Sequence, residues 1–275
     1  MTCDELMSRF LKKRAELSYA NANAKNDGYG GWVTDFHIQL KDGTQKRKMA
    51  LDLNENEEAD LFLLFVLAVA WSRTGQWENS AFFVSYLKLV EELNSMSKIR
   101  KWVDGKLING ELESLSKDYA EQAAKKLVSD CKPRDKISLR CDTLESIKVL
   151  MDNWNDIKET LAKSNKTGDY TIFTDKMRLI DGLGAPRKGK KAKMSMKILL
   201  ILRELRIQGV YDNIPGELCC VPDARVKKAA KNISDLKLLQ YGSFEAHLKN
   251  SKLIYEKFGD WYDIPLFAYE ELVKE

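Results

Sequence analysis

Apolar residues recur every three or four positions along most of this chain, and this helical period constrains the fold more than any other feature of its sequence. The pattern predicts helices over residues 3–19, 57–73, 79–96, 111–130, 143–163, 175–180, 193–208, 224–231, 234–239, 243–258 and 265–274. The chain has 275 residues, 44% of them hydrophobic, which is enough to close a buried core. We therefore expect a mainly α fold in which the helices at the two ends of the chain pack together.

One segment departs from the helical period. Residues 32–53 alternate between apolar and polar side chains and contain the pair Asp42-Gly43, whose residues both tolerate a positive φ. These features predict a small β-hairpin near the N-terminus. The preceding residues 21–31 (NANAKNDGYGG) are rich in Asn and Gly and are expected to form a loop.

Several classes of protein lack support in the sequence. The longest apolar run, residues 61–71, is shorter than a transmembrane helix requires, and the N-terminus has no secretory signal, so we expect an intracellular protein of the cytoplasm or nucleoid with no membrane partner. Five cysteines without a CxxC pair and only two histidines, His37 and His247, predict no metal site. We interpret the adjacent Cys219 and Cys220 as small apolar residues in a packed segment. Neither a phosphate-binding loop for NTP nor a dinucleotide fingerprint is present.

Positive charge is concentrated in one stretch. Residues 187–197 (RKGKKAKMSMK) contain six cations and no acid, although the net charge of the chain is only +4. A solvated basic face is one interpretation of such a run. Directly upstream, Gly182-Leu183-Gly184 predicts a tight turn between two helices, because glycine allows a positive φ and close backbone approach. A turn of this kind at a helix start favours phosphate binding, so we predict DNA-backbone contacts. The residues concerned are Gly182, Gly184, Arg187, Lys188, Lys191 and Lys193.

A nucleophile and a carboxylate can be nominated beside this turn. Lys190 lies among other cations, which disfavour its ammonium form and increase the fraction of free amine. Asp223 follows an apolar segment and Pro222, at the N-cap position of a predicted helix. A purely structural cap is the simplest interpretation of Asp223. The two roles are compatible, because one carboxylate oxygen can cap the helix while the other faces a substrate.

These residues carry a family resemblance. Residues 184–199 (GAPRKGKKAKMSMKIL) and 219–226 (CCVPDARV) resemble the helix-hairpin-helix region of the archaeal GO glycosylases, a branch of the helix-hairpin-helix DNA glycosylase superfamily. That family has a Gly-Ala-x-Arg-x-x-Lys stretch before a Lys-Ile-Leu helix, and then Pro-Val-Asp-x-Arg-Val at a similar separation. A weaker match lies in residues 67–87 (LAVAWSRTGQWENSAFFVSYL). The resemblance covers about two thirds of the chain, from about residue 61 to residue 225.

The resemblance implies a two-lobed helical fold of the DNA glycosylase type. One lobe would comprise residues 1–60 and 225–275, with the β-hairpin, and the other residues 61–224, with the helix-hairpin-helix motif at about 175–207. It also implies a monomer that acts on double-stranded DNA containing damaged guanine and excises 8-oxoguanine after the nucleotide is flipped out of the stack. The Lys190 amine would attack the deoxyribose C1′ and form a Schiff base, β-elimination would nick the strand, and Asp223 would stabilise the positive charge on the sugar. This chemistry needs no metal or cofactor.

The resemblance also nominates contacts to the excised base. It carries a base-contacting tryptophan onto Trp77 and places Met194 where the family has a stacking aromatic. Near the C-terminus it places Tyr269 and Val273 where the family has an aspartate and a tryptophan, respectively. Trp261 could supply a stacking surface from another point of the chain. Core or rim packing is the competing interpretation of these side chains. Two other functions stay open: a glycosylase for a different damaged base, and a helix-hairpin-helix protein that binds DNA without cutting it.

Overall fold

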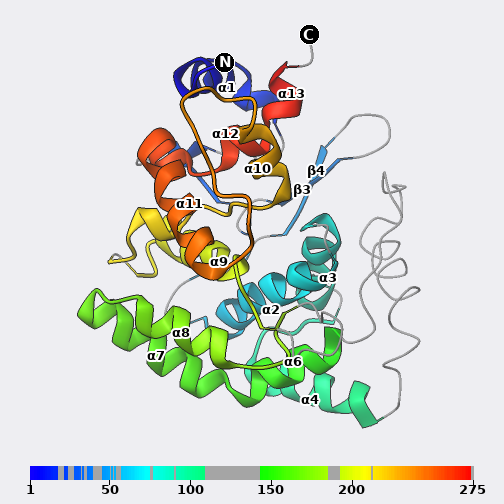
Figure 1. The fold of residues 1–275 in the computed structure, drawn as a ribbon. Helices are drawn as coiled ribbons and strands as arrows, with labels where there is room; N and C mark the ends of the chain where they lie inside the picture. The colour runs from blue at the N-terminus through cyan, green and yellow to red at the C-terminus, as the bar shows by residue number, and fades with distance from the viewer. Residues whose placement is uncertain are drawn as a thin grey trace. The chain divides into compact units, whose positions relative to one another are not determined.

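The structure is a computed structural model that describes most of the chain. The described residues are 1–17, 22–23, 28–31, 33, 36–39, 45–49, 51, 53, 57–74, 77–89, 91–108, 143–184, 193–211 and 213–273. Helices dominate them, and strands contribute only short antiparallel pairs (Figure 1). The prediction of a mainly α fold is therefore confirmed. None of the helices in these ranges combines the length and the apolar character that a membrane crossing requires.

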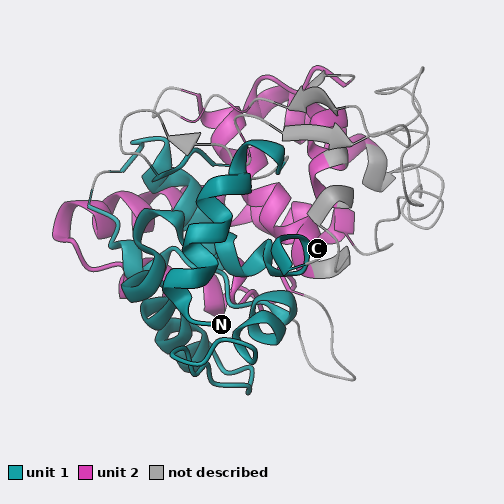
Figure 2. Ribbon diagram, turned by 90° about the horizontal axis from the view of Figure 1, so that it is seen from above, with its two compact units in different colours: residues 1–32, 198–275 teal, residues 33–197 magenta. Residues whose placement is uncertain are grey.

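The chain divides into two compact units, shown in different colours in Figure 2. The terminal unit comprises residues 1–32 and 198–275, and the central unit comprises residues 33–197. The division predicted from the sequence, at residues 60/61 and 224/225, differs from these boundaries. The β-hairpin belongs to the central unit because its second strand packs against helix α3, and residues 198–207 belong to the terminal unit because Arg203 forms an ion pair with Asp263.

The central unit is built around a single buried helix. Helix α2 (Glu58–Thr74) is buried continuously from Leu61 to Trp71, and it packs against α3 (Trp77–Leu89), α4 (Met96–Ile108) and α6 (Thr143–Asp152). The indole of Trp154 meets the rings of Phe62 and Phe65 edge to face, at centroid distances of 5.0 and 5.2 Å. An apolar run that is too short for a bilayer thus forms the core of this unit.

The remaining elements of the central unit lie at its two ends in sequence. Helix α7 (Trp154–Thr167) ends at Gly168, which adopts a left-handed conformation, and packs against α8 (Thr171–Leu179). Strands β3 (Phe36–Gln39) and β4 (Gln45–Met49) pair antiparallel, with Gln39 opposite Gln45. This pairing confirms the predicted hairpin, whose turn at Asp42-Gly43 lies outside the described residues.

The terminal unit brings the two ends of the chain together, as predicted. Its helices are α1 (Cys3–Lys13), α9 (Lys197–Ile207), α10 (Ala224–Ala230), α11 (Phe244–Phe258), α12 (Ile264–Phe267) and α13 (Tyr269–Val273). A capping box of Thr2 and Glu5 starts α1, which packs against α11, α12 and α13. The backbone N–H of Cys3 also donates to the carboxylate of Asp235 at 2.8 Å.

Short elements complete the terminal unit. Its 3₁₀-helices are η1 (Arg14–Glu16), η3 (Gly216–Leu218) and η4 (Gly259–Trp261). Strands β1 (Ala22–Asn23) and β2 (Gly28–Tyr29) pair antiparallel inside the segment that was expected to be a loop throughout. Tyr29 is fully buried, which anchors strand β2 in the core of this unit.

Several helix predictions were wrong in their limits or their existence. Residues 234–239 contain no helix, because the backbone of Leu239 bonds to the side chain of Asn250 instead of to its own preceding turn. The helix predicted over 143–163 is interrupted at Asn153, and that over 265–274 at Ala268. Helix α4 was not predicted over most of its length. The helix predicted over 111–130 lies outside the described residues.

Candidate functional site

The predicted glycine turn follows helix α8 and is fixed by the central unit. Gly182 has a φ of 95°, and its carbonyl accepts a hydrogen bond of 2.6 Å from the Ser146 hydroxyl. A Cβ on Gly184 would lie 2.1 Å from the carbonyl oxygen of Lys193, so only glycine fits here. Asp181 and Lys193 form an antiparallel bridge. Gly184 and Lys193, nine positions apart in sequence, therefore lie next to each other.

The helix after this turn begins later than predicted. The sequence predicted a helix over 193–208, with the turn at its start, whereas α9 begins at Lys197. The backbone of Lys193 pairs with Asp181, so Lys193 cannot be the first residue of a helix. Lys193 is exposed, and Met194 is 1% exposed. The other nominated cations lie outside the described residues: Arg187, Lys188, Lys190 and Lys191.

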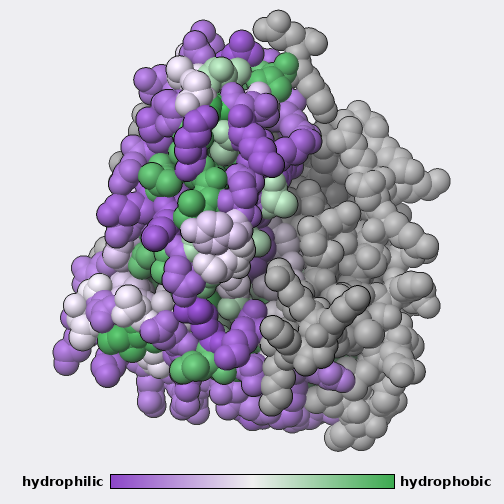
Figure 3. All heavy atoms as spheres, viewed as in Figure 1, coloured by the Kyte–Doolittle hydropathy of each residue, from purple (hydrophilic) through white to green (hydrophobic). Residues whose placement is uncertain are grey.

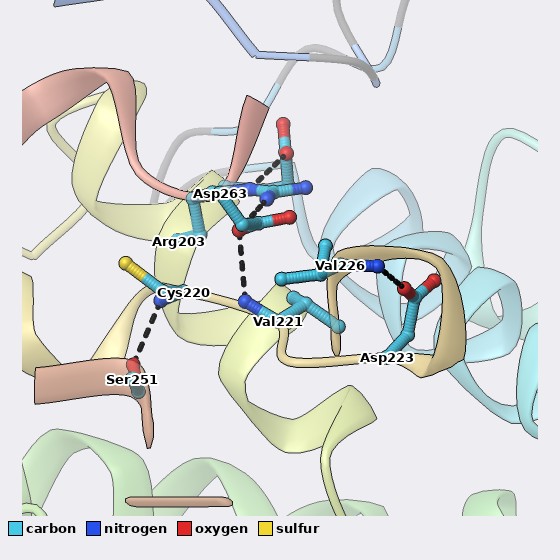
Figure 4. Close-up of polar contacts among 8 residues, drawn as sticks. Arg203, Cys220, Val221, Asp223, Val226, Ser251 and Asp263 are labelled. Atoms are coloured by element: carbon cyan, nitrogen blue, oxygen red, sulfur yellow. Dashed lines mark hydrogen bonds and ion pairs between the residues drawn. The ribbon is translucent and has the colours of Figure 1, made fainter. Parts of the chain in front are cut away.

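Asp223 is the N-cap of helix α10, as the sequence predicted. Its Oδ1 accepts a hydrogen bond of 2.9 Å from the backbone N–H of Val226, and the side chain is half-buried (Figure 4). Within the described ranges, Oδ2 accepts no hydrogen bond and forms no ion pair. One carboxylate oxygen therefore holds the helix, while the other is available for a ligand.

The segment that leads to Asp223 is held by buried polar contacts. The backbone N–H of Cys220 donates to the Ser251 hydroxyl at 2.9 Å, and the backbone N–H of Val221 donates to Oδ1 of Asp263 at 2.8 Å (Figure 4). Both bonds are buried. Two consecutive N–H groups in an extended segment thus find acceptors on side chains from α11 and from the residue before α12. These bonds determine where Asp223 lies.

Asp263 in turn is bound to a buried arginine. Arg203 of α9 donates from Nη1 to Oδ1 of Asp263 at 2.8 Å, and its Nε lies 3.3 Å from Glu204. Burial lowers the pKa of Arg203, but the charges of Asp263 and Glu204 outweigh this and raise it. Burial raises the pKa of Asp263, and Arg203 only partly opposes that. This pattern is expected where one guanidinium lies beside two buried carboxylates: Arg203 has two anions near it, whereas Asp263 shares its cation with Glu204.

The sequence reasoning did not identify Arg203 or Asp263. The available signal was a charged pair, Arg203-Glu204, inside the apolar run of the helix predicted over 193–208. Charged residues at such positions are rarely buried unless they are paired. The partner could not be found from spacing, because Asp263 is 60 positions away.

The nominated base contacts lie in different surroundings. Trp77 is the first residue of α3, and Tyr269 is half-buried at the start of α13. Trp261 is 6% exposed, with the Phe10 ring 5.1 Å from its own and the Arg14 guanidinium 5.0 Å from its ring centre. In this structure Trp261 is thus a core residue.

Cys219 and Cys220 are buried and unpaired with each other, and burial raises the pKa of both thiols. They are therefore packed apolar residues, as predicted, and their raised pKa values keep them in the unreactive thiol form.

Comparison with known proteins adds no further constraint. No protein-family model, curated protein or solved structure matches the chain.

Proposed function

We propose that this protein is a DNA glycosylase with β-lyase activity that excises 8-oxoguanine from double-stranded DNA, acting as a monomer without a metal or cofactor. The observation that carries the proposal is the geometry of Asp223, whose Oδ1 caps α10 while Oδ2 has no partner within the described ranges. If Asp223 were only an N-cap, Oδ1 alone would be sufficient. The second oxygen supplies a fixed negative charge at the end of a rigid segment.

The proposed chemistry uses this carboxylate and an amine. The free amine of Lys190 attacks C1′ of the damaged nucleotide, and the bond from C1′ to the base breaks with its electron pair leaving on the base. Asp223 stabilises the positive charge that develops on the sugar. Ring opening gives a Schiff base between Lys190 and C1′, loss of a proton from C2′ eliminates the 3′ phosphate, and hydrolysis releases the enzyme. The step sequence consumes only water.

DNA binding in this proposal depends on the turn after α8. The proposed helix-hairpin-helix motif would place the backbone of Gly182 and Gly184 against phosphates, and the basic residues 187–193 would neutralise further phosphates. The close packing of Gly184 on Lys193 supports it, because it fixes both ends of the basic stretch at one place. Binding of this kind would be strongly dependent on salt.

The proposed contacts with the flipped base come from aromatic side chains. Met194 and Trp261 are buried and Tyr269 is half-buried, so we assign contact with the flipped base to Tyr269 first. Trp77, whose side chain lies outside the described part of the structure, is proposed from the resemblance alone. A base other than 8-oxoguanine would require changes at these contacts and not in the amine chemistry.

Borohydride trapping tests the amine chemistry. The protein is incubated with duplex DNA that contains one 8-oxoguanine, reduced, and examined for a covalent protein–DNA product. The wild type should give this product and Lys190→Gln should not, whereas the matched control Lys188→Gln should retain it. A product with another lesion would keep the glycosylase and change the base. DNA binding without a product on any lesion would leave the non-catalytic DNA-binding function instead.

Asp223→Asn tests the carboxylate separately. Asparagine is as good an N-cap as aspartate, so the stability of the protein should change little. Loss of the trapped product with unchanged stability would support a catalytic Asp223. Full retention of trapping would refute that role.

A further inference from the structure

The segment between α10 and α11 is fixed by side chains, although it contains no helix or strand. Asn250 of α11 is fully buried, and its side chain both accepts from the N–H of Leu239 at 2.8 Å and donates to the carbonyl of Leu239 at 2.9 Å. Ile233, Leu236 and Leu238 are buried beneath the segment. Its backbone therefore has one defined path up to Leu239.

A buried lysine fixes the same segment two residues later. The ammonium of Lys227, on α10, donates to the carbonyl of Tyr241 at 3.1 Å, and Lys227 is only 9% exposed. Burial lowers its pKa, and the charge of Asp223 partly opposes this. Within the described ranges no carboxylate forms an ion pair with Lys227. Moving the Lys227 ammonium out of water is unfavourable. In return it forms a hydrogen bond to the backbone carbonyl of Tyr241, an exposed residue.

That residue presents an aromatic ring to solvent. Among the side chains that the structure describes, three large apolar ones are exposed, and Tyr241, at 58%, is the only aromatic one. On the face shown in Figure 3, the described surface is mainly hydrophilic, with apolar residues in small groups. Ser243, two residues later, caps α11 by accepting from the N–H of Ala246. The backbone that carries the exposed ring of Tyr241 is thus fixed at Tyr241 and again at Ser243.

The segment that carries this ring is basic in sequence. Residues 224–243 contain five basic residues and one acid. Arg225 and Lys228 pair with glutamates of α13, whereas Lys231 and Lys237 are exposed and form no ion pair with any residue that the structure describes. An exposed aromatic ring on a basic segment is a combination with which proteins bind unstacked bases of a nucleic acid.

We propose that Tyr241 is a stacking surface for an unpaired base of the DNA strand, held in place by Lys227 one helical turn from Asp223. The inference rests on the proposed function, because it assumes that Asp223 acts on DNA. Asp223 caps α10, and Lys227 of the same helix binds the carbonyl of Tyr241. A peptide is a poorer occupant than a base, because Gln240, Gly242 and Ser243, which flank the ring, are exposed and offer no continuous apolar patch. The natural ligand is a base left without its partner beside the lesion.

The experiment measures binding and stacking on one duplex. The duplex contains a tetrahydrofuran abasic analogue with 2-aminopurine opposite, so that anisotropy reports affinity and 2-aminopurine fluorescence reports stacking. Stacking of one base on an aromatic ring corresponds to about a 5- to 150-fold effect of alanine substitution on affinity. Tyr241→Ala should weaken binding within that range and remove the quenching, and Tyr241→Phe should retain both. Leu11→Ala, another exposed apolar residue of the terminal unit, should change neither.

The outcomes separate this inference from the proposed function. A wild type that binds and traps DNA, with Tyr241→Ala equal to it in both readouts, overturns the stacking role and leaves the glycosylase intact. A wild type that binds no DNA overturns both. Lys227→Met should reduce the quenching at unchanged thermal stability, because the carbonyl of Tyr241 loses its donor. Unchanged quenching in Lys227→Met would overturn the anchoring role of the lysine.

Discussion

Replacing Asp263 by alanine should be among the most destabilising single substitutions in the terminal unit. Oδ1 of Asp263 accepts two buried hydrogen bonds of 2.8 Å, one from Arg203 and one from the backbone of Val221. Removing one partner of a buried ion pair costs about 3–5 kcal/mol, since the other charge stays buried. Leaving the N–H of Val221 without an acceptor costs about 1–3 kcal/mol more in isolation. The two costs are not fully additive, and Glu204 still partly compensates the charge of Arg203. We therefore expect the free energy of unfolding to fall by about 4 kcal/mol.

Equilibrium urea denaturation, followed by circular dichroism, measures this loss. Asp263→Asn should lose about half as much, because the amide oxygen keeps an acceptor but not the charge. Lys228→Ala is the matched control: it removes an exposed ion pair with Glu270, and such pairs contribute less than about 1 kcal/mol. Amide hydrogen exchange gives a second readout, in which Val221 should exchange faster in Asp263→Ala than in the wild type. A loss below about 1 kcal/mol in Asp263→Ala, equal to that of the control, would refute the argument that this network fixes the Asp223 segment.

Three further predictions concern single positions. Asp223→Ala should lower the free energy of unfolding by about 1 kcal/mol while Asp223→Asn leaves it nearly unchanged, as urea denaturation would show; equal losses would contradict the capping role. Gly184→Ala should lower the melting temperature because its Cβ would lie 2.1 Å from a backbone oxygen, whereas Gly105→Ala, in an open position on α4, should raise it; the opposite order would exclude the close contact. The hydrogen bond from Lys257 lowers the pKa of Asp235 to about 2, so its stabilising effect should be complete above pH about 4 and be lost as the pH falls towards 2. Melting temperatures of wild type and Asp235→Asn should therefore converge in that range, and a constant difference would contradict the shift.

Local sequence predicted those elements whose stabilisation is local. Residues 244–258 form a helix almost as expected, because Ser243 caps an amphipathic stretch. The hairpin of β3 and β4 follows from alternation around a turn pair. Residues 234–239 have a similar apolar spacing but form no helix, since Asn250 provides partners for Leu239. The competing hydrogen bonds come from 11 positions away, so no local pattern reveals them.

The features of the candidate site that depend on neighbouring residues were also predictable from the sequence. Asp223 was identified as an N-cap from Pro222 and the apolar residues around it, and Gly182 and Gly184 from the need for a turn. The buried contacts that position Asp223 were not predicted. Arg203 and Asp263 are 60 positions apart, so their pairing is visible only in the tertiary structure. Lys227 was likewise one basic residue among several until its contact with Tyr241 was known.

The sequence by itself determined the helical class, the positions of the caps and glycine turns, and the location of the basic stretch, because each depends on residues within one or two turns of one another. Only the tertiary structure decided which charges are buried together, which of two similar apolar patterns becomes a helix, and which aromatic ring stays exposed. Those outcomes depend on partners that are distant in the chain and on the high free energy of a buried polar group without a partner. Trp261 and Tyr241 illustrate the difference: both are aromatic residues in segments that mix apolar and polar side chains, but the fold buries the first and exposes the second.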